Sequence, residues 1–247
     1  MGGRIWMQFA AARTGSRFLP SVMERRKGTK RDVKEGAAVR CQAAALILAG
    51  GKSSRMGCCK ATLPLSQTTF IEYQVALLAS VFQQVIVSTN TPEDLPPLEN
   101  VEFVPDRWTG APPCAMRGLH GGLFASAFPQ VFVIPADQPL LSKPLLASMY
   151  RSLGGEEALL PLFQKRVYPL HGFYRRNILG KVEDHLRREE YGLTALCRTL
   201  SVQYYPEEQI RLYDPNGVCL KGANTPKEYQ ELLRMSEALR RVGGMRP

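Results

Sequence analysis

The sequence predicts a single α/β domain of three layers, in which a mostly parallel sheet is covered by helices on both faces. Its 247 residues, 45% of them apolar, suffice for the core of such a domain. Expected strands and helices alternate along the first half of the chain. The expected strands are continuous apolar runs rather than alternating ones, which is typical of parallel strands buried on both faces.

Each element of the first half is recognised by its own pattern. The run 43–48 is short, apolar and followed by a glycine pair, as expected of a buried strand. Apolar residues at near-helical spacing predict a helix over 69–81. Ser142 and Pro144 suit the cap and the first turn of another helix. The remaining expectations are strands at 84–88, 101–104 and 131–134 and a helix at 119–128.

The second half is less regular but contains no linker, so one domain over 42–235 is expected. The segments 158–161 and 167–169 fit a hairpin. The other expected elements are a helix over 175–188, a strand over 202–205 and a final helix over 226–239. In an open parallel sheet the ligand binds at the carboxyl ends of the strands, where the strand order reverses. Functional residues are therefore sought directly after strands.

The net charge of +10 is concentrated at the two ends of the chain. Residues 1–41 contain ten Lys or Arg and three Asp or Glu, whereas residues 234–247 contain four and one. The segment between them has eighteen of each sign and is neutral. We expect 1–41 to be a disordered basic extension and 236–247 a basic tail. Because such ends bind RNA only weakly, through counterion release, nucleic acid is not the expected partner of the domain.

Composition also bears on the compartment. The six cysteines form no C-x-x-C spacing, so neither a zinc site nor a disulfide framework is expected, and a reducing cytoplasm fits. The longest apolar runs are far too short to span a bilayer. Residues 1–22 superficially resemble an organellar transit peptide, but a start codon assigned upstream of Met23 would give the same picture.

The strongest motif is a glycine-rich loop over residues 48–60, directly after the first expected strand. Gly50 and Gly51 let the backbone turn sharply and bring several N–H groups against phosphate oxygens. Arg55 and Lys60 add two cations, which suit a triphosphate with about four negative charges. The loop is not a Walker motif, since Leu46 stands where that motif needs a glycine. A plain surface turn explains the glycines but not the cations.

The pattern L-A-G-G-x-S-x-R-M-G-x-x-K resembles the signature of the NTP-transferase superfamily. Its S-S-R-M-G version resembles the MobA-like molybdenum cofactor guanylyltransferases and their cytidylyltransferase relatives. The resemblance covers residues 43–235 and implies the Rossmann-like fold of nucleotide-diphospho-sugar transferases. The chain departs from the family at Cys59, where an aspartate usually precedes the lysine. The implied nucleotide contacts of the loop come from Leu48, Ala49, Gly50, Gly51 and Lys60.

Two further residues follow the next two expected strands. Asn90 comes after 84–88, and its side chain offers a donor and an acceptor suited to reading a base edge. Asp106 comes after 101–104 and resembles the family's aspartate upstream of a G-P-L-A-G segment. The resemblance implies that both bind the nucleotide. A turn-capping role for Asn90 before Pro92 stays open.

The stretch after Asp106 departs from the family pattern. Gly118, Gly121 and Gly122 predict a close backbone approach at a helix start, which is a natural anion site. His120 is a candidate acid or base, although the sequence offers it no partner.

Asp137 emerges from the end of the apolar strand expected at 131–134. Because a lone buried charge is costly, such a carboxylate usually meets water, a cation or a ligand. The resemblance implies that Asp137 binds Mg²⁺, which one carboxylate and substrate phosphates can hold together. The D-Q-P wording is closer to the cytidylyltransferase branch, and a simple turn with Pro139 is the structural alternative.

Two late segments resemble parts of the cofactor enzymes that face the pterin phosphate acceptor, namely 169–175 and 222–226. Asn224 is the candidate acceptor-binding residue. An ordinary helix start, with Thr225 as cap and Pro226 in the first position, explains the second segment equally well.

The resemblance implies a molybdenum cofactor guanylyltransferase, which transfers GMP from GTP to molybdopterin and releases pyrophosphate, with Arg55, Lys60 and Asp137 as catalytic residues. The implied partners are GTP, molybdopterin and the molybdoenzymes or biosynthetic proteins that receive the product. CTP-dependent cytidylyl transfer is the near alternative. A non-catalytic nucleotide- or cofactor-binding accessory protein is a second alternative, and RNA binding through the basic ends a third.

Overall fold

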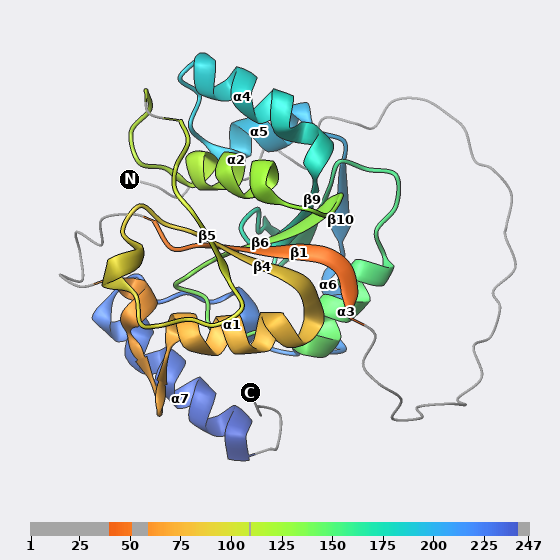
Figure 1. Cartoon of the computed structure of the whole chain (residues 1–247). Helices are drawn as coiled ribbons and strands as arrows, with labels where there is room; N and C mark the ends of the chain where they lie inside the picture. Colours follow the sequence, from red (N-terminus) through yellow and green to blue (C-terminus); the bar gives the residue numbers. More distant parts are fainter. Residues whose placement is uncertain (1–39, 51–58, 109, 242–247) are drawn as a thin grey trace, which may run out of the picture. The chain divides into compact units, whose positions relative to one another are not determined.

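The sheet runs through the middle of the domain and is mostly parallel, as predicted (Figure 1). A computed structural model describes residues 40–50, 59–108 and 110–241. Across the sheet the strand order is β10-β7-β9-β6-β1-β4-β5. These strands are β1 (Cys41–Leu48), β4 (Phe82–Ser88), β5 (Glu102–Val104), β6 (Gln130–Pro135), β7 (Ala158–Phe163), β9 (Gly172–Arg175) and β10 (Val202–Tyr205).

β1 is an inner strand of the sheet and pairs in parallel with both of its neighbours, β4 and β6. The chain passes from β1 to β4 and β5 on one side and then returns to β6 on the other, so the strand order reverses at β1. Only β9 among the sheet's seven main strands runs against its neighbours β6 and β7. The reversal places the end of β1 where open α/β sheets bind ligands.

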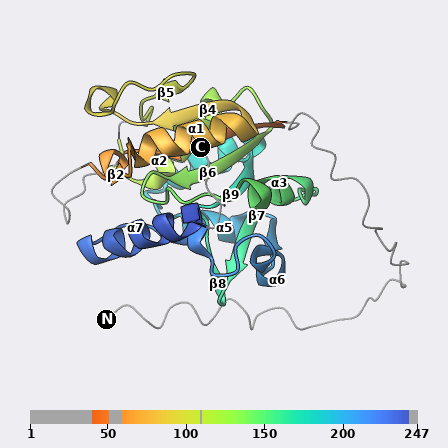
Figure 2. The ribbon, with the colours of Figure 1, turned by 90° about the horizontal axis from the view of Figure 1, so that it is seen from below.

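Helices cover both faces of the sheet (Figures 1 and 2). One face carries α2 (Ala115–Ala125), α4 (Leu179–Arg187) and α5 (Leu193–Thr199). The other face carries α1 (Phe70–Val81), α3 (Lys143–Arg151), α6 (Glu207–Arg211) and α7 (Pro226–Arg241). Within the described residues, no helix combines the length and the apolar character that crossing a bilayer requires.

β1 explains why its sequence is continuously apolar. Ala43, Ala45 and Ile47 belong to the core under α1 and α3, whereas Leu46 and Leu48 belong to the core under α2 and α4. Successive strand residues point to opposite faces of the sheet, and helices cover both faces. Neither of the two alternating sets of positions in β1 faces solvent, so both are apolar.

Side-chain caps begin two of the helices, and the one at Ser142 was predicted from the sequence. The Thr69 hydroxyl accepts a hydrogen bond from the Glu72 amide, and the Glu72 carboxylate accepts one from the Thr69 amide, which closes a capping box at the start of α1. Ser142 caps α3 through the Leu145 amide at 3.4 Å, with a proline in the first turn. The expected hairpin is also confirmed, because β7 pairs antiparallel with β8 (Arg166–Val167).

Several local predictions were wrong. The helix expected over 175–188 begins later, because residues 172–175 form β9 and a single 3₁₀ turn over Arg176–Ile178 precedes α4. The short helices α5 and α6 were not anticipated. The small elements that complete the described part of the chain are β2 (Pro64–Leu65), β3 (Thr68–Thr69) and 3₁₀ turns at Lys60–Thr62, Pro92–Asp94 and Val218–Leu220.

The glycines of α2 serve packing rather than an anion site. The helix starts at Ala115, so Gly118 and Gly122 lie inside it, against the sheet. A Cβ atom at Gly118 would lie 2.7 Å from the Leu48 side chain, and one at Gly122 would overlap the Leu46 side chain. Glycine at these positions lets α2 approach β1 closely.

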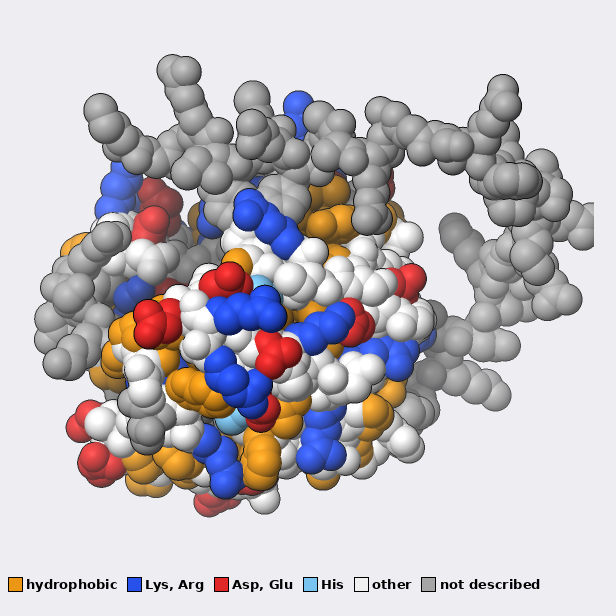
Figure 3. All heavy atoms as spheres, turned by 90° about the horizontal axis from the view of Figure 1, so that it is seen from above, with side chains coloured by type: hydrophobic (Ala, Val, Ile, Leu, Met, Phe, Trp, Pro, Cys, Tyr) orange, Lys and Arg blue, Asp and Glu red, His pale blue; other side chains and the backbone are white. Residues whose placement is uncertain are grey.

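The surface over α2, α4 and α5 has no field of one sign. Seen from that side, acidic and basic side chains lie interspersed (Figure 3). Arg187 illustrates the pattern, because it pairs with Glu183 at 3.0 Å and with Asp184 at 2.7 Å on α4. This agrees with the neutral charge of the central part of the sequence.

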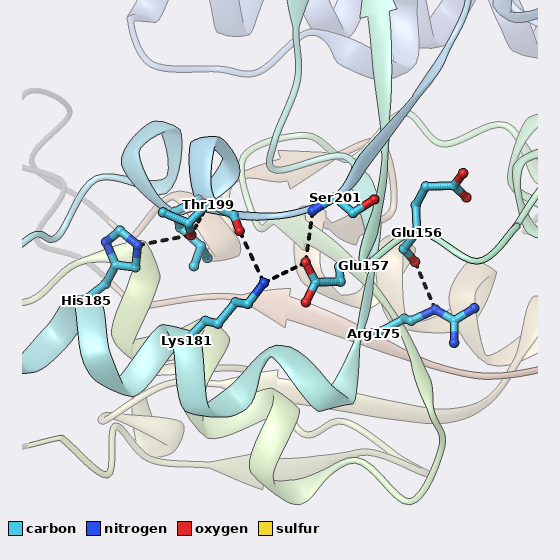
Figure 4. A network of polar contacts seen from close by, with 8 residues as sticks. Glu156, Glu157, Arg175, Lys181, His185, Thr199 and Ser201 are labelled. Carbon is cyan, nitrogen blue, oxygen red and sulfur yellow. Dashed lines mark hydrogen bonds and ion pairs between the residues drawn. The ribbon is translucent and has the colours of Figure 1, made fainter. Parts of the chain in front are cut away.

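A polar network ties α4 and the α5–β10 link to the start of β7 (Figure 4). Glu157 accepts hydrogen bonds from Lys181 Nζ at 2.8 Å and from the Ser201 amide at 2.9 Å. Burial opposes ionisation of Glu157, but these bonds outweigh it and lower its pKa. Because Glu157 precedes β7, the network lies at the amino ends of the parallel strands, away from the expected ligand edge, and its role is structural.

Replacing Gly122 by Ala should destabilise the domain by about 1–3 kcal/mol, because the new methyl group overlaps Leu46 in a packed core. Urea unfolding measures the change. The matched control is Gly180→Ala in α4, where a Cβ meets nothing within 4 Å. The control should be neutral or slightly stabilising, since alanine favours helix. Equal effects in the two variants would contradict the packing role of Gly122.

His171, just before β9, is buried against the Phe132 ring, and neither of its ring nitrogens has a hydrogen-bond partner among the described residues. Burial lowers its pKa from 6.5 to about 4, although the negative charge of Asp214 opposes this shift. The folded protein therefore holds a neutral imidazole that the unfolded chain protonates below pH 6.5.

Stability should consequently fall as the pH drops from 6.5 towards 4, by about 3 kcal/mol from this residue. His171→Met, of similar volume, should match the wild type at pH 7 or exceed it and should lose less stability at pH 4.5. Urea unfolding at both pH values tests this. A parallel decline in the two proteins would rule out His171 as the source.

Candidate functional site

Four paired residues at the carboxyl ends of neighbouring strands form a row along one edge of the sheet, and the residues predicted to bind a ligand come just after them. Leu48 pairs with Ser88 of β4 and with Pro135 of β6, and Ser88 pairs with Val104 of β5. Gly50, Asn90, Asp106 and Asp137 each lie two residues beyond a member of this row. Neighbouring strands are about 4.8 Å apart, so Asp106 and Asp137 are separated by roughly three such steps, with the end of β1 between them.

Backbone hydrogen bonds to both neighbouring strands hold the chain where the loop leaves β1. The Ala49 amide donates to the Ser88 carbonyl at 2.9 Å, and the Leu48 carbonyl accepts from the Ala136 amide at 3.0 Å. The structure describes the loop as far as Gly50 and again from Cys59, whereas Gly51 and Arg55 lie outside the described residues. The start of the loop is thereby fixed at the reversal of strand order.

One polar cluster forms at the β6 end of the row. Lys60 Nζ lies 3.1 Å from Asp137 Oδ2 and donates to Asn224 Oδ1 at 2.6 Å. The three residues come from the end of the glycine loop, the end of β6 and the start of α7, which are far apart in sequence. The lysine and the carboxylate are only partly buried, with 23% and 18% of their side chains exposed, so both can reach a ligand.

The surroundings of Asp137 fit a divalent cation. In the described part of the chain, no group donates to its Oδ1 atom. A Cβ atom at Gly222 would lie 3.1 Å from this Oδ1, so glycine keeps the carboxylate approachable. No cluster of three or more His, Cys, Asp or Glu occurs within the described residues. Asp137 could supply one carboxylate ligand to a divalent cation that substrate phosphates also bind.

A second cluster forms at the β5 end of the row. Asn90 Nδ2 donates to Asp106 Oδ2 at 3.0 Å, while the Asp106 amide donates to Asn90 Oδ1 at 2.8 Å. A backbone N–H can only donate, so this pair of bonds fixes the orientation of the Asn90 amide. The alternative in which Asn90 caps a turn gains no support from these contacts, because its side chain bonds to Asp106.

The sequence did not single out Arg117, which completes this second cluster. Its Nε atom lies 3.2 Å from Asp106 Oδ2, and its Nη1 donates to the Ala111 carbonyl at 2.6 Å. The only signal for it was a cation in a glycine-rich stretch that departs from the resembling family.

Cys59 and His120 belong to neither of the two clusters. Cys59, the departure from the family, binds Thr62 through its carbonyl at the 3₁₀ turn. His120 contacts Glu183 of α4 at 3.3 Å and the Trp108 ring edge-on. His120 thus packs α2 against its neighbours, and its contacts give no support to an acid or base role.

Comparison with known proteins identifies relatives over most of the chain. A protein from Peptoclostridium acidaminophilum, named as a probable molybdenum cofactor guanylyltransferase, is 28% identical over 78% of this chain and 89% of its own. A molybdenum cofactor guanylyltransferase from Syntrophotalea carbinolica is also 28% identical, over 79% of this chain and 92% of its own.

Solved structures show the same fold. Molybdopterin-guanine dinucleotide biosynthesis protein A from Archaeoglobus fulgidus superposes with a TM-score of 0.70 at 22% identity, over 79% of this chain and 99% of its own. The 2-C-methyl-D-erythritol 4-phosphate cytidylyltransferase from Thermus thermophilus has a TM-score of 0.57 at 18% identity, over 81% and 98%. Residues 45–204 match the MobA-like NTP transferase domain. The chain belongs to this family and is by that membership a nucleotidyltransferase.

Proposed function

We propose that this protein transfers GMP from GTP to molybdopterin and releases pyrophosphate. The observation that carries the proposal is the row at the carboxyl edge, which has an amide–carboxylate pair at one end, a lysine–carboxylate pair at the other and Gly50, where the glycine loop begins, between them. The names of its relatives supply the acceptor and the base.

The β6 end of the row suits the reacting phosphates. Lys60 already lies beside a carboxylate and an amide oxygen, so its ammonium group is held in place before a triphosphate arrives. Asp137 would hold Mg²⁺ through the Oδ1 atom that Gly222 leaves approachable. The bound ion would neutralise phosphate charge and stabilise the leaving pyrophosphate. Arg55 would add a second cation from the loop.

The acceptor needs binding more than activation. A phosphate monoester is already anionic at neutral pH, so it attacks without a general base. The two clusters accordingly contain no His–carboxylate pair. Asn224 bonds to Lys60, so it can orient the acceptor next to the cation that balances its charge.

The β5 end of the row suits a guanine base. Asp106 presents acceptors, and the second N–H of Asn90 presents a donor. Guanine offers two adjacent donors, N1–H and the 2-amino group, to a carboxylate. Cytosine offers one donor next to the N3 acceptor, which a carboxylate repels. This difference supports GTP over CTP, although the D-Q-P wording at Asp137 resembles the cytidylyltransferase branch.

The remaining assignments follow from this reaction. We propose Mg²⁺ as the metal, the cytoplasm as the compartment, and molybdoenzymes or other cofactor-biosynthesis proteins as recipients of the product. The boundaries at 42 and 235 are part of the proposal, with basic segments outside them; α7 continues through Arg241.

The direct test is pyrophosphate release from GTP or CTP, with and without molybdopterin, in the presence of Mg²⁺. We expect release with GTP only when molybdopterin is present, and at least about tenfold less with CTP. Faster release with CTP would make the protein a cytidylyltransferase. Nucleotide binding without release from either NTP would instead support an accessory protein.

Lys60→Ala and Asp137→Ala should each lower the rate of pyrophosphate release by about 10²–10³-fold, because each removes charge stabilisation at the phosphates. Thermal unfolding should remain close to that of the wild type, since both side chains are partly exposed. Lys165→Ala, which removes an exposed lysine from the β7–β8 turn, is the matched control and should keep full activity. Near-normal rates in either site variant would remove its assignment.

A further inference from the structure

Two side chains hold Asp106 from different sides, and one of them forms a nearly buried ion pair with it. Asn90 approaches from the neighbouring strand end, whereas the Arg117 guanidinium approaches from inside α2. Only 11% of the Arg117 side chain and 12% of the Asp106 side chain are exposed. A nearly buried ion pair is costly to desolvate, and removing one partner leaves the other charge uncompensated.

Arg117 also closes the loop that carries Asp106. Its Nε atom lies 3.2 Å from the Asp106 carboxylate, and its Nη1 donates to the Ala111 carbonyl at 2.6 Å, so one guanidinium contacts both ends of the segment 106–111. The Nε–H makes no well-aligned hydrogen bond, so the contact with Asp106 is mainly one of charge. The position of Arg117 is fixed in turn because Gly118 brings α2 against Leu48 and Ser88.

These contacts leave a defined set of free positions for a ligand. In the described part of the chain, both the Asn90 amide and Arg117 use Asp106 Oδ2, and no group donates to Oδ1. Oδ2 also keeps a free lone pair, because the Arg117 N–H is not aligned with it. The carboxylate therefore offers two adjacent acceptors in one orientation while its charge is compensated from behind.

We propose that Arg117 is a positioning residue for base selection, holding Asp106 so that its carboxylate accepts from both N1–H and the 2-amino group of guanine. The proposal rests on the proposed use of GTP but goes beyond it. It assigns the discrimination between bases to the 2-amino group of guanine. It assigns the orientation of the Asp106 carboxylate to Arg117, which does not itself contact the nucleotide. Without Arg117, the carboxylate keeps its hydrogen bond from Asn90 but loses its second contact and can rotate towards solvent.

The test compares GTP with ITP, which lacks only the 2-amino group. Equilibrium binding to the free protein should favour GTP by about ten- to a hundredfold in the wild type, as expected for a hydrogen bond to a charged group. In Arg117→Met this preference should fall to about threefold or less. In turnover, KM for GTP should rise while kcat changes little, because the base lies away from the reacting phosphorus.

The matched control is Arg176→Met. Arg176 also donates to backbone carbonyls of α2, at Leu123 and Phe124, but it makes no contact with Asp106. It should keep the full preference for GTP over ITP. Arg117→Lys keeps the charge and loses the fork, so it should give an intermediate preference, and it replaces Arg117→Met if that variant does not fold.

A double variant separates positioning from general stability. In an Asp106→Asn background, Arg117→Met should cause no further loss of GTP over ITP preference, since the carboxylate it positions is absent. The proposal is overturned if Arg117 variants keep the wild-type preference, or if Arg176→Met loses it equally. Pyrophosphate release without any GTP over ITP preference would overturn this inference and leave the proposed function standing. A preference for GTP over ITP without any pyrophosphate release would overturn the proposed function alone.

Discussion

Parallel pairing of β1 with β4 and β6 is the constraint on which the remainder of the site depends. The pairing sets Leu48, Ser88 and Pro135 at one level, and β5 extends the level to Val104. Each of these strands then ends at the same edge of the sheet. Side chains two positions beyond the ends of adjacent strands are therefore neighbours in space, although they are distant in sequence. A shift of one residue in this register would turn the same residues to another face.

The two ends of the row differ in electrostatics. At one end Lys60 balances Asp137 in a partly exposed pair, which can open towards phosphates and a metal. At the other end Arg117 balances Asp106 in a pair that is almost buried. A partly exposed pair is inexpensive to rearrange, whereas a buried one holds its geometry. The proposed chemistry and the proposed base recognition make use of this difference.

Close packing of α2 connects the core to the second end. Gly118 and Gly122 allow the helix to lie directly on β1, where larger residues would meet Leu48 and Leu46. The approach brings Arg117 within reach of Asp106 and places His120 against Glu183 and Trp108. The glycines that resembled an anion site thus act through packing, and the arginine between sheet and loop acts through charge.

The sequence alone determined the fold class, the parallel strands of the first half and the residues at strand ends, because apolar runs, caps and glycine punctuation are local signals. It also identified Lys60, Asn90, Asp106, Asp137 and Asn224 as candidates. Only the tertiary structure decided which of them meet, since register and helix packing join residues 77 or 164 positions apart. It alone revealed Arg117 and the strand β9, because an arginine in a helix and a short strand beside a predicted helix acquire their roles from non-local neighbours.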